Sequence, residues 1–218
     1  MRLAKCAGYR AVGLIVRADV STLPVLLPTL VPLVKTASLY AGIEAFAGAE
    51  LVHVPPALLP DAVERARELG AALVLGHGES VPRHLTDVVE TGTNLAAVRA
   101  GVDILAHPGL ITPEDAELAA ERGVLLELST APRHCLANGH VARMAERFGC
   151  GLILGSDAST ASDARGHAGA PQGRGPRRGT RRRRAVPAAC DRKATCPETP
   201  ASVSLPPENG GIPFSFHR

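Results

Sequence analysis

Histidine and acidic residues follow several short apolar runs of this sequence, at positions where they could bind a metal ion together. His77 follows the run AALVLG, and His107 follows VDILA. Asp157 follows GLILGS, and Glu50 lies near the end of EAFAGAEL, a run that His53 follows closely. Imidazole nitrogens and carboxylate oxygens are the ligands that zinc, manganese and iron take in proteins. We therefore treat Glu50, His77, His107 and Asp157 as candidate metal ligands.

A single sheet edge would bring these residues together. The apolar runs predict strands, and patterns of helical periodicity lie between them. The predicted strands are 11–16, 44–51, 71–76, 102–106, 124–128 and 151–156, and the predicted helices are 60–70, 93–101, 113–123 and 139–149. This alternation is typical of the α/β class, as an open sheet or a barrel, whose parallel strands place ligands at their carboxyl ends. The segment 20–40 is ambiguous, because prolines interrupt an otherwise helical pattern.

The chain changes character after residue 158. Residues 1–157 hold 13 basic and 17 acidic residues, whereas 158–218 hold 11 and 4, so the net charge of +3 hides a strongly basic tail. This tail is rich in glycine and proline and poor in large apolar residues, which predicts disorder. We expect a folded domain at 1–158 and a disordered Arg/Gly/Pro-rich tail at 159–218. The run RRRR at 181–184 could bind nucleic acid, but charge runs are usually solvated.

Composition argues against several other classes of protein. Aromatic residues make up 3% of the chain and tryptophan is absent, which disfavours binding of single-stranded nucleic acid by stacking. The five cysteines form no C-x-x-C pair or dense framework, so a reducing compartment is expected. The N-terminal sequence does not match a secretory signal, and we expect no membrane span. We therefore predict a cytoplasmic protein of unknown oligomeric state.

Several blocks of the sequence resemble PHP-domain proteins of the histidinol-phosphatase-like group. The similarity covers about residues 5–158. The blocks are GAELVHVPP (48–56), LVLGHGESV (73–81), GTNLAAVRAGVDILAHPGLITPEDAELAAERGVLLELS (92–129), NGHVARMAERFG (138–149) and LILGSDA (152–158). The resemblance implies a distorted seven-stranded TIM-like (βα) barrel that hydrolyses phosphoesters with one to three divalent ions, zinc, manganese or iron. It also implies that Glu50, His77, His107 and Asp157 are metal ligands.

Other family ligands are absent from this sequence. The H-x-H of the first family strand has no counterpart, so six strands are predicted where seven are implied and the barrel is incomplete. The Thr-Asp-His of the next strand is replaced by Ile15-Val16-Arg17, which puts a cation in place of a ligand and could attract phosphate. The final Asp-x-His is replaced by Asp157-Ala158-Ser159. We therefore expect weakened metal binding. We also expect that the chain starts within a longer open reading frame and that a change of reading frame gives rise to its C-terminal tail.

The resemblance implies a phosphatase in which a metal-activated water attacks phosphorus. His134 or His140 could donate a proton to the leaving alcohol, and Arg133 could contact the phosphate. His140 could equally face solvent. Glu79 could orient a ligand histidine, although a role as a loop acid is the simpler interpretation. The partner expected is a small phosphorylated substrate, with no membrane and no nucleic acid.

Three other interpretations remain open. The chain could be a non-catalytic metal- or phosphate-binding remnant of a PHP domain, or it could bind nucleic acid through its basic tail. Nucleophilic catalysis by Cys135 or Ser129 is disfavoured, because neither lies in a G-x-S-x-G turn.

Overall fold

The sheet of this protein is parallel and curled. The computed structural model describes residues 1–6, 8–81, 89–158 and 214–217. Seven strands pair in the order β6-β5-β4-β3-β2-β1-β7, all of them parallel. The strands are β1 (Ala11–Ala18), β2 (Glu44–Leu51), β3 (Leu73–His77), β4 (Ile104–Ala106), β5 (Leu125–Ser129), β6 (Leu152–Gly155) and β7 (Phe214–His217).

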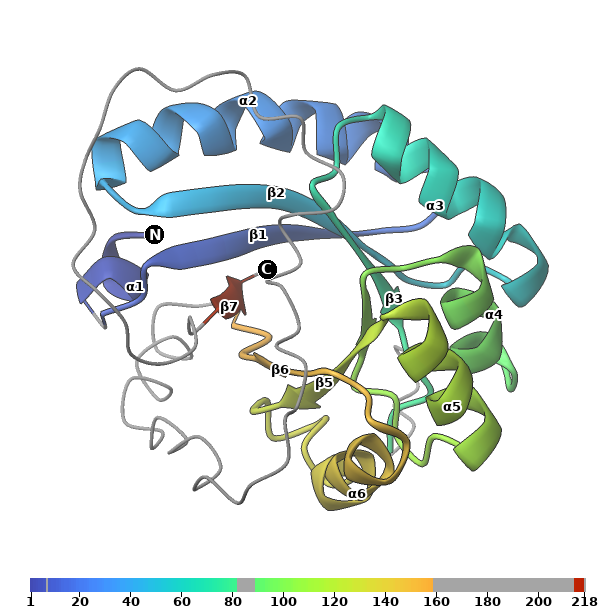
Figure 1. Ribbon diagram of the computed structural model, residues 1–218. Coiled ribbons are helices and arrows are strands. Elements are labelled where there is room, and N and C mark those ends of the chain that lie inside the picture. The colour runs from blue at the N-terminus through green and yellow to red at the C-terminus, as the bar shows by residue number, and fades with distance from the viewer. Residues whose placement is uncertain (7, 82–88, 159–213, 218) are drawn as a thin grey trace.

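Helices connect the strands and cover the outer side of the sheet (Figure 1). They are α1 (Arg2–Cys6), α2 (Leu23–Ala41), α3 (Leu59–Glu68), α4 (Thr93–Ala100), α5 (Pro113–Arg122) and α6 (Asn138–Phe148), with a 3-10 turn η1 (Pro56–Leu58) before α3. Strands β1 to β6 therefore form a curled half-barrel with alternating helices. This arrangement confirms the predicted α/β class and is consistent with an incomplete TIM-like barrel.

Local sequence signals explain where the elements begin and end. In α5, the Thr112 side chain accepts the backbone N–H of Asp115 at 3.1 Å, and Pro113 occupies the first turn. Gly123 ends this helix in the left-handed conformation, with φ +70°. The six predicted strands and four predicted helices all occur, with boundaries that differ by at most two residues.

Apolar side chains form one layer on each face of the sheet. The outer layer joins strand residues such as Val74 and Leu126 to helix residues such as Leu59 and Ala97. The inner layer consists of strand residues alone, with Ile15, Leu75, Ile104 and Ala106 buried and Leu73, Leu125 and Ile153 packed against them. Because side chains alternate along a strand, residues two positions beyond an inner-layer residue also face the inside.

Helix α2 is continuous although the sequence pattern was ambiguous here. Pro28 and Pro32 lie inside it, and with Pro24 they fall four residues apart on an exposed face. The carbonyl groups that lose a backbone partner at these prolines can bond with water on that face, so the helix persists. Leu23, Leu27 and Val34 are buried on the opposite face.

Helix α2 is also unusually apolar for a helix at the surface. Leu39 is 84% exposed and Tyr40 is 90% exposed, and Lys35 is the helix's one charged residue. By length and composition alone it could cross a membrane, with a mean hydropathy of 1.4 over its best window. The expectation that no segment has the properties of a membrane span is therefore not confirmed. A packed helix of a soluble protein or a signal sequence passes the same test, so this is weak evidence for a span.

Strand β7 was not predicted from the sequence. It pairs with the free edge of β1, with Ala11 opposite Phe214 and Leu14 opposite His217. The predicted tail otherwise lies outside the described residues, including the basic run at 181–184. Of the cysteines in the described part of the chain, Cys6, Cys135 and Cys150 are free thiols.

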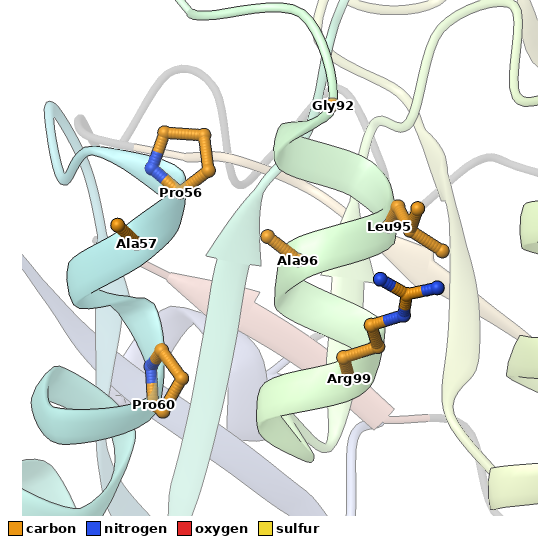
Figure 2. A pocket seen from close by; sticks show the side chains of 7 residues that line it. All are labelled: Pro56, Ala57, Pro60, Gly92, Leu95, Ala96 and Arg99. Atoms are coloured by element: carbon orange, nitrogen blue, oxygen red, sulfur yellow. The ribbon is translucent and has the colours of Figure 1, made fainter.

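A shallow pocket of about 280 Å³ lies between α3 and α4. Figure 2 shows its lining, which is Pro56, Ala57, Pro60, Gly92, Leu95, Ala96 and Arg99. None of the candidate metal ligands lines this pocket, and all of them lie at or near the carboxyl ends of the strands.

Candidate metal centre

A layer of polar side chains lies above the inner apolar layer, at the carboxyl ends of the strands. Arg17 follows Ile15 by two residues, His77 follows Leu75, and Glu127 follows Leu125. Glu50 follows Gly48 by two residues. A side chain on Gly48 would meet the Cδ1 atom of Ile15 at 2.6 Å, so this position also faces inward. The fold therefore directs charged and imidazole groups from several strands into one space.

Three of the predicted ligands form one compact group. The ligand atoms of Glu50, His77 and His107 all lie within 4.8 Å of one another, and all three residues are buried. The Oε1 atom of Glu50 is 2.6 Å from Nδ1 of His77 and 3.5 Å from Nε2 of His107. The two imidazole rings meet edge to face at 4.4 Å between centroids. One carboxylate oxygen and two imidazole nitrogens form a donor set that is suited to a transition metal.

A buried nitrogen of His77 supports this interpretation. Its Nδ1 contacts Glu50, whereas its Nε2 is buried with no hydrogen-bond partner among the described residues. Buried polar atoms are normally satisfied, so an orphaned imidazole nitrogen needs an explanation. A metal ion held by this nitrogen, with the carboxylate behind it fixing the ring, is a common arrangement in metalloproteins.

The backbone at His107 is strained and held by Glu127. His107 has φ +31°, in a region that residues with a side chain rarely adopt. Its backbone N–H donates to Oε2 of Glu127 at 2.9 Å, and Glu127 is buried. Gly155 makes room for this acid, because a Cβ atom there would overlap the Glu127 carboxylate. Strain that is held in this way often marks a functional position.

His134 and Asp157 form a second group beside the first. The His134 ring stacks on the His107 ring with 4.0 Å between centroids and 13° between planes. Its Nε2 lies 3.6 Å from Oδ2 of Asp157, and its Nδ1 lies 3.2 Å from the hydroxyl of Ser80. Asp157 is buried and has φ +48°. The compact group therefore does not include Asp157, which joins it through His134.

Asn94 at the start of α4 connects the segments that directly follow His77 and His107. Its Nδ2 donates to the carbonyl of Pro108 at 2.9 Å, and its Oδ1 accepts the backbone N–H of Glu79 at 3.0 Å. The Glu79 carboxylate accepts the backbone N–H groups of Gly92 (2.9 Å) and Asn94 (3.1 Å). Glu79 therefore caps a helix, and the hydrogen bonds found for it support the interpretation as a loop acid.

The remaining sequence candidates lie around this core. Nε2 of His140 is 2.8 Å from the carbonyl of Ile111, so this half-buried ring donates to backbone instead of facing solvent freely. Arg133 is half-exposed, and its Nη2 lies 3.9 Å from Oδ2 of Asp157. Ser129 is fully buried and its hydroxyl accepts the backbone N–H of Ala131 at 3.3 Å.

Glu127, Asn94 and Ser80 are residues of the site that were not predicted from the sequence. Glu127 lies in the apolar run that predicts strand 124–128. A charged residue inside such a run is unusual, and this is the one feature of the sequence that could have indicated it. Asn94 lies in a predicted helix, where an asparagine does not by itself indicate a functional role. Glu127 acts through the backbone of His107, and Asn94 acts through two loops, so spacing alone does not reveal either.

Comparison with known proteins identifies a relative of this chain. No family model matches this chain. The uncharacterized protein MJ1295 of Methanocaldococcus jannaschii is 33% identical over 165 residues, which cover 75% of this chain and 74% of that protein.

Solved structures show a weaker likeness. The structures of an uncharacterized protein and of an amidohydrolase each match 75% of this chain, with 15% sequence identity and a TM-score of 0.45. The chain spans 58% of each of those chains. A likeness at this level assigns neither the fold nor an activity.

Proposed function

The chain belongs to the family of the archaeal protein MJ1295, which is itself uncharacterized, and we propose from the geometry of its site that it is a metal-dependent hydrolase. The observation that carries this proposal is the buried group of Glu50, His77 and His107 at the carboxyl ends of parallel strands. In α/β barrels this end of the sheet is where catalytic residues gather. The donor set suits zinc, manganese or iron.

The residues around the group suit hydrolysis. A divalent ion in such a site supplies Lewis-acid chemistry, which lowers the pKa of water towards neutrality and withdraws charge from the bond to be cleaved. The ring of His134 lies between Ser80, whose hydroxyl is 3.2 Å from its Nδ1, and Asp157, whose Oδ2 is 3.6 Å from its Nε2. An imidazole in this position can pass a proton to a leaving group, with the nearby carboxylate stabilising its charged form.

The reaction that we propose in finer detail is hydrolysis of a phosphate monoester by a site of the PHP type. The resemblance to histidinol-phosphatase-like proteins supports this substrate class. Arg133 adds to that support, since a half-exposed guanidinium beside Asp157 can reach an anionic group that enters from solvent. On this proposal the partner is a small phosphorylated molecule in the cytoplasm, and neither a membrane nor a nucleic acid is required.

Hydrolysis of a generic aryl phosphate tests the proposal. The full chain is loaded with zinc, manganese or iron(II) in turn and assayed against an aryl phosphate and an aryl amide. We expect metal-dependent release of phosphate, with loss of activity in His107→Ala. The control is His53→Asn, which changes an exposed histidine to a residue that tolerates its φ of +54°.

The outcomes separate the competing functions. Cleavage of the amide alone would keep a hydrolase and reject the phosphoesterase. Metal binding without turnover of either substrate would favour the non-catalytic binding remnant. A wild-type protein that neither binds metal nor hydrolyses substrate would reject the proposal as a whole.

A further inference from the structure

Arg17 lies near the carboxyl end of β1, beside the candidate metal centre. It lies on β1 directly opposite Glu50 of β2 in the parallel register. Side chains at paired positions of parallel strands point to the same face. Glu50 points inward, where it contacts His77, and the preceding inward residue of β1, Ile15, lies over Gly48. Arg17 therefore faces the same space as the buried carboxylate.

The burial of Arg17 fits this position. The residue is partly buried, and its Nε atom is enclosed by protein. Arg133, in contrast, is half-exposed on the loop after β5. A guanidinium carried by a strand inside the barrel is a fixed charge, whereas a loop arginine at the surface is largely screened by water.

The charges of the site indicate how many metal ions it can hold. The buried carboxylates of Glu50, Glu127 and Asp157 carry three negative charges when ionised. One divalent ion and the Arg17 guanidinium carry three positive charges, so this combination is neutral. A second divalent ion would leave an excess of buried positive charge, and next to Arg17 it would meet direct repulsion.

We propose that this centre takes a single divalent ion and that Arg17 supplies the second fixed positive charge, where it binds an anionic oxygen of the phosphate substrate. This inference rests on the proposed function and specifies its substrate-binding residue. A guanidinium binds two phosphate oxygens through parallel N–H groups, which fixes orientation as well as charge. Arg17 therefore binds the phosphate group, whereas Glu50, His77 and His107 bind the metal.

Metal content and phosphate binding test this proposal on the full chain. Metal bound per chain is measured by elemental analysis after dialysis, and binding of inorganic phosphate to the metal-loaded protein is measured by calorimetry. We expect one ion per chain in the wild type and in Arg17→Met. We expect phosphate affinity to fall by about tenfold or more in Arg17→Met, as for loss of a charge-assisted hydrogen bond.

Two further variants keep the test decisive. Arg10→Met removes the same charge just before β1, from an exposed residue, and should leave phosphate binding unchanged. If Arg17→Met does not fold, Arg17→Lys decides. An ammonium group cannot form the two parallel hydrogen bonds, so the phosphate affinity of Arg17→Lys should be lower than that of the wild type.

Several results would overturn the inference. These are two or more ions per wild-type chain, absence of phosphate binding by the metal-loaded wild type, or equal phosphate affinity in Arg17→Met and Arg10→Met. Unchanged affinity in Arg17→Lys, where that variant decides, would do the same. A wild-type chain that binds no metal would instead reject the metal-dependent hydrolase itself, so the two failures are distinguishable.

Discussion

Oε1 of Glu50 lies 2.6 Å from Nδ1 of His77, and both side chains are buried although they are 27 residues apart in sequence. Two adjacent parallel strands, β2 and β3, create this pair by placing both side chains on the inner face. The pair matters for function because the carboxylate fixes the imidazole whose other nitrogen has no hydrogen-bond partner among the described residues.

Replacing Glu50 by glutamine should weaken metal binding. The amide keeps the shape but loses the negative charge, and loss of a carboxylate that orients a ligand histidine lowers metal affinity by about 10- to 100-fold. Competition with a chromogenic chelator measures the change. Glu44→Gln, an exposed acid at the other end of the same strand, is the matched control. Equal zinc affinity in the two variants would contradict the role given to Glu50.

Replacing Gly155 by alanine should destabilise the protein and disturb the centre. The added methyl group would overlap the Glu127 carboxylate, which in turn holds the strained backbone of His107. Overpacking of this kind costs about 1–3 kcal/mol. Urea denaturation measures the free energy of unfolding, and a chelator titration measures metal affinity.

Gly139→Ala is the control for that change. Gly139 lies in α6 with open space around it, so an alanine should stabilise the helix by up to about 1 kcal/mol. If Gly155→Ala is as stable as the wild type and binds metal equally well, Glu127 does not support His107 in the way described.

Asp19 should make the stability of the chain depend on pH. Its Oδ1 atom accepts from the hydroxyl of Ser21 at 2.7 Å and from the backbone N–H of Thr22 at 2.9 Å, before α2 begins. The bond from the Ser21 hydroxyl, followed by those from Thr22, holds the pKa of Asp19 well below its ordinary value of 3.8. A lowered pKa in the folded state stabilises the fold above the ordinary value, and this stabilisation is lost as pH falls through the folded-state pKa.

Asp19→Asn should therefore be less stable than the wild type at neutral pH, and the difference should narrow as pH falls below 3.8. Urea denaturation at a series of pH values measures both proteins. A difference that stays constant across the series would show that the charge of Asp19 does not contribute. Because the group is largely exposed, the effect should be small and should shrink further in high salt.

The sequence predicted most of the barrel because its signals are local. Apolar runs that end on a histidine or an acid marked β2, β3, β4 and β6, and capping residues such as Thr112 and Gly123 marked helix ends. Helix α2 was ambiguous, because the effect of a proline depends on whether its face is exposed. Strand β7 was not predicted, since four residues inside a basic, proline-rich segment carry little pattern and pairing with β1 defines the strand.

The site residues at the ends of strands could be predicted from the sequence. Those that act by hydrogen bonding to the backbone of another residue could not. Glu50, His77 and His107 come together as the spacing indicated, and His134 joins them. Glu127 was missed, because its role depends on the space left by Gly155 and on the conformation of His107.

The position of the bound metal decides whether Glu50, His77 and His107 form a metal centre. A crystal of the full chain grown with zinc or manganese, with data collected at the absorption edge of the metal, locates the ion by its anomalous scattering. We predict one strong peak at about 2.0–2.2 Å from ligand atoms of His77 and His107, with Glu50 as the third ligand or hydrogen-bonded to His77. A peak elsewhere on the chain, or no peak in crystals grown with excess metal, would show that these three residues do not form a metal centre.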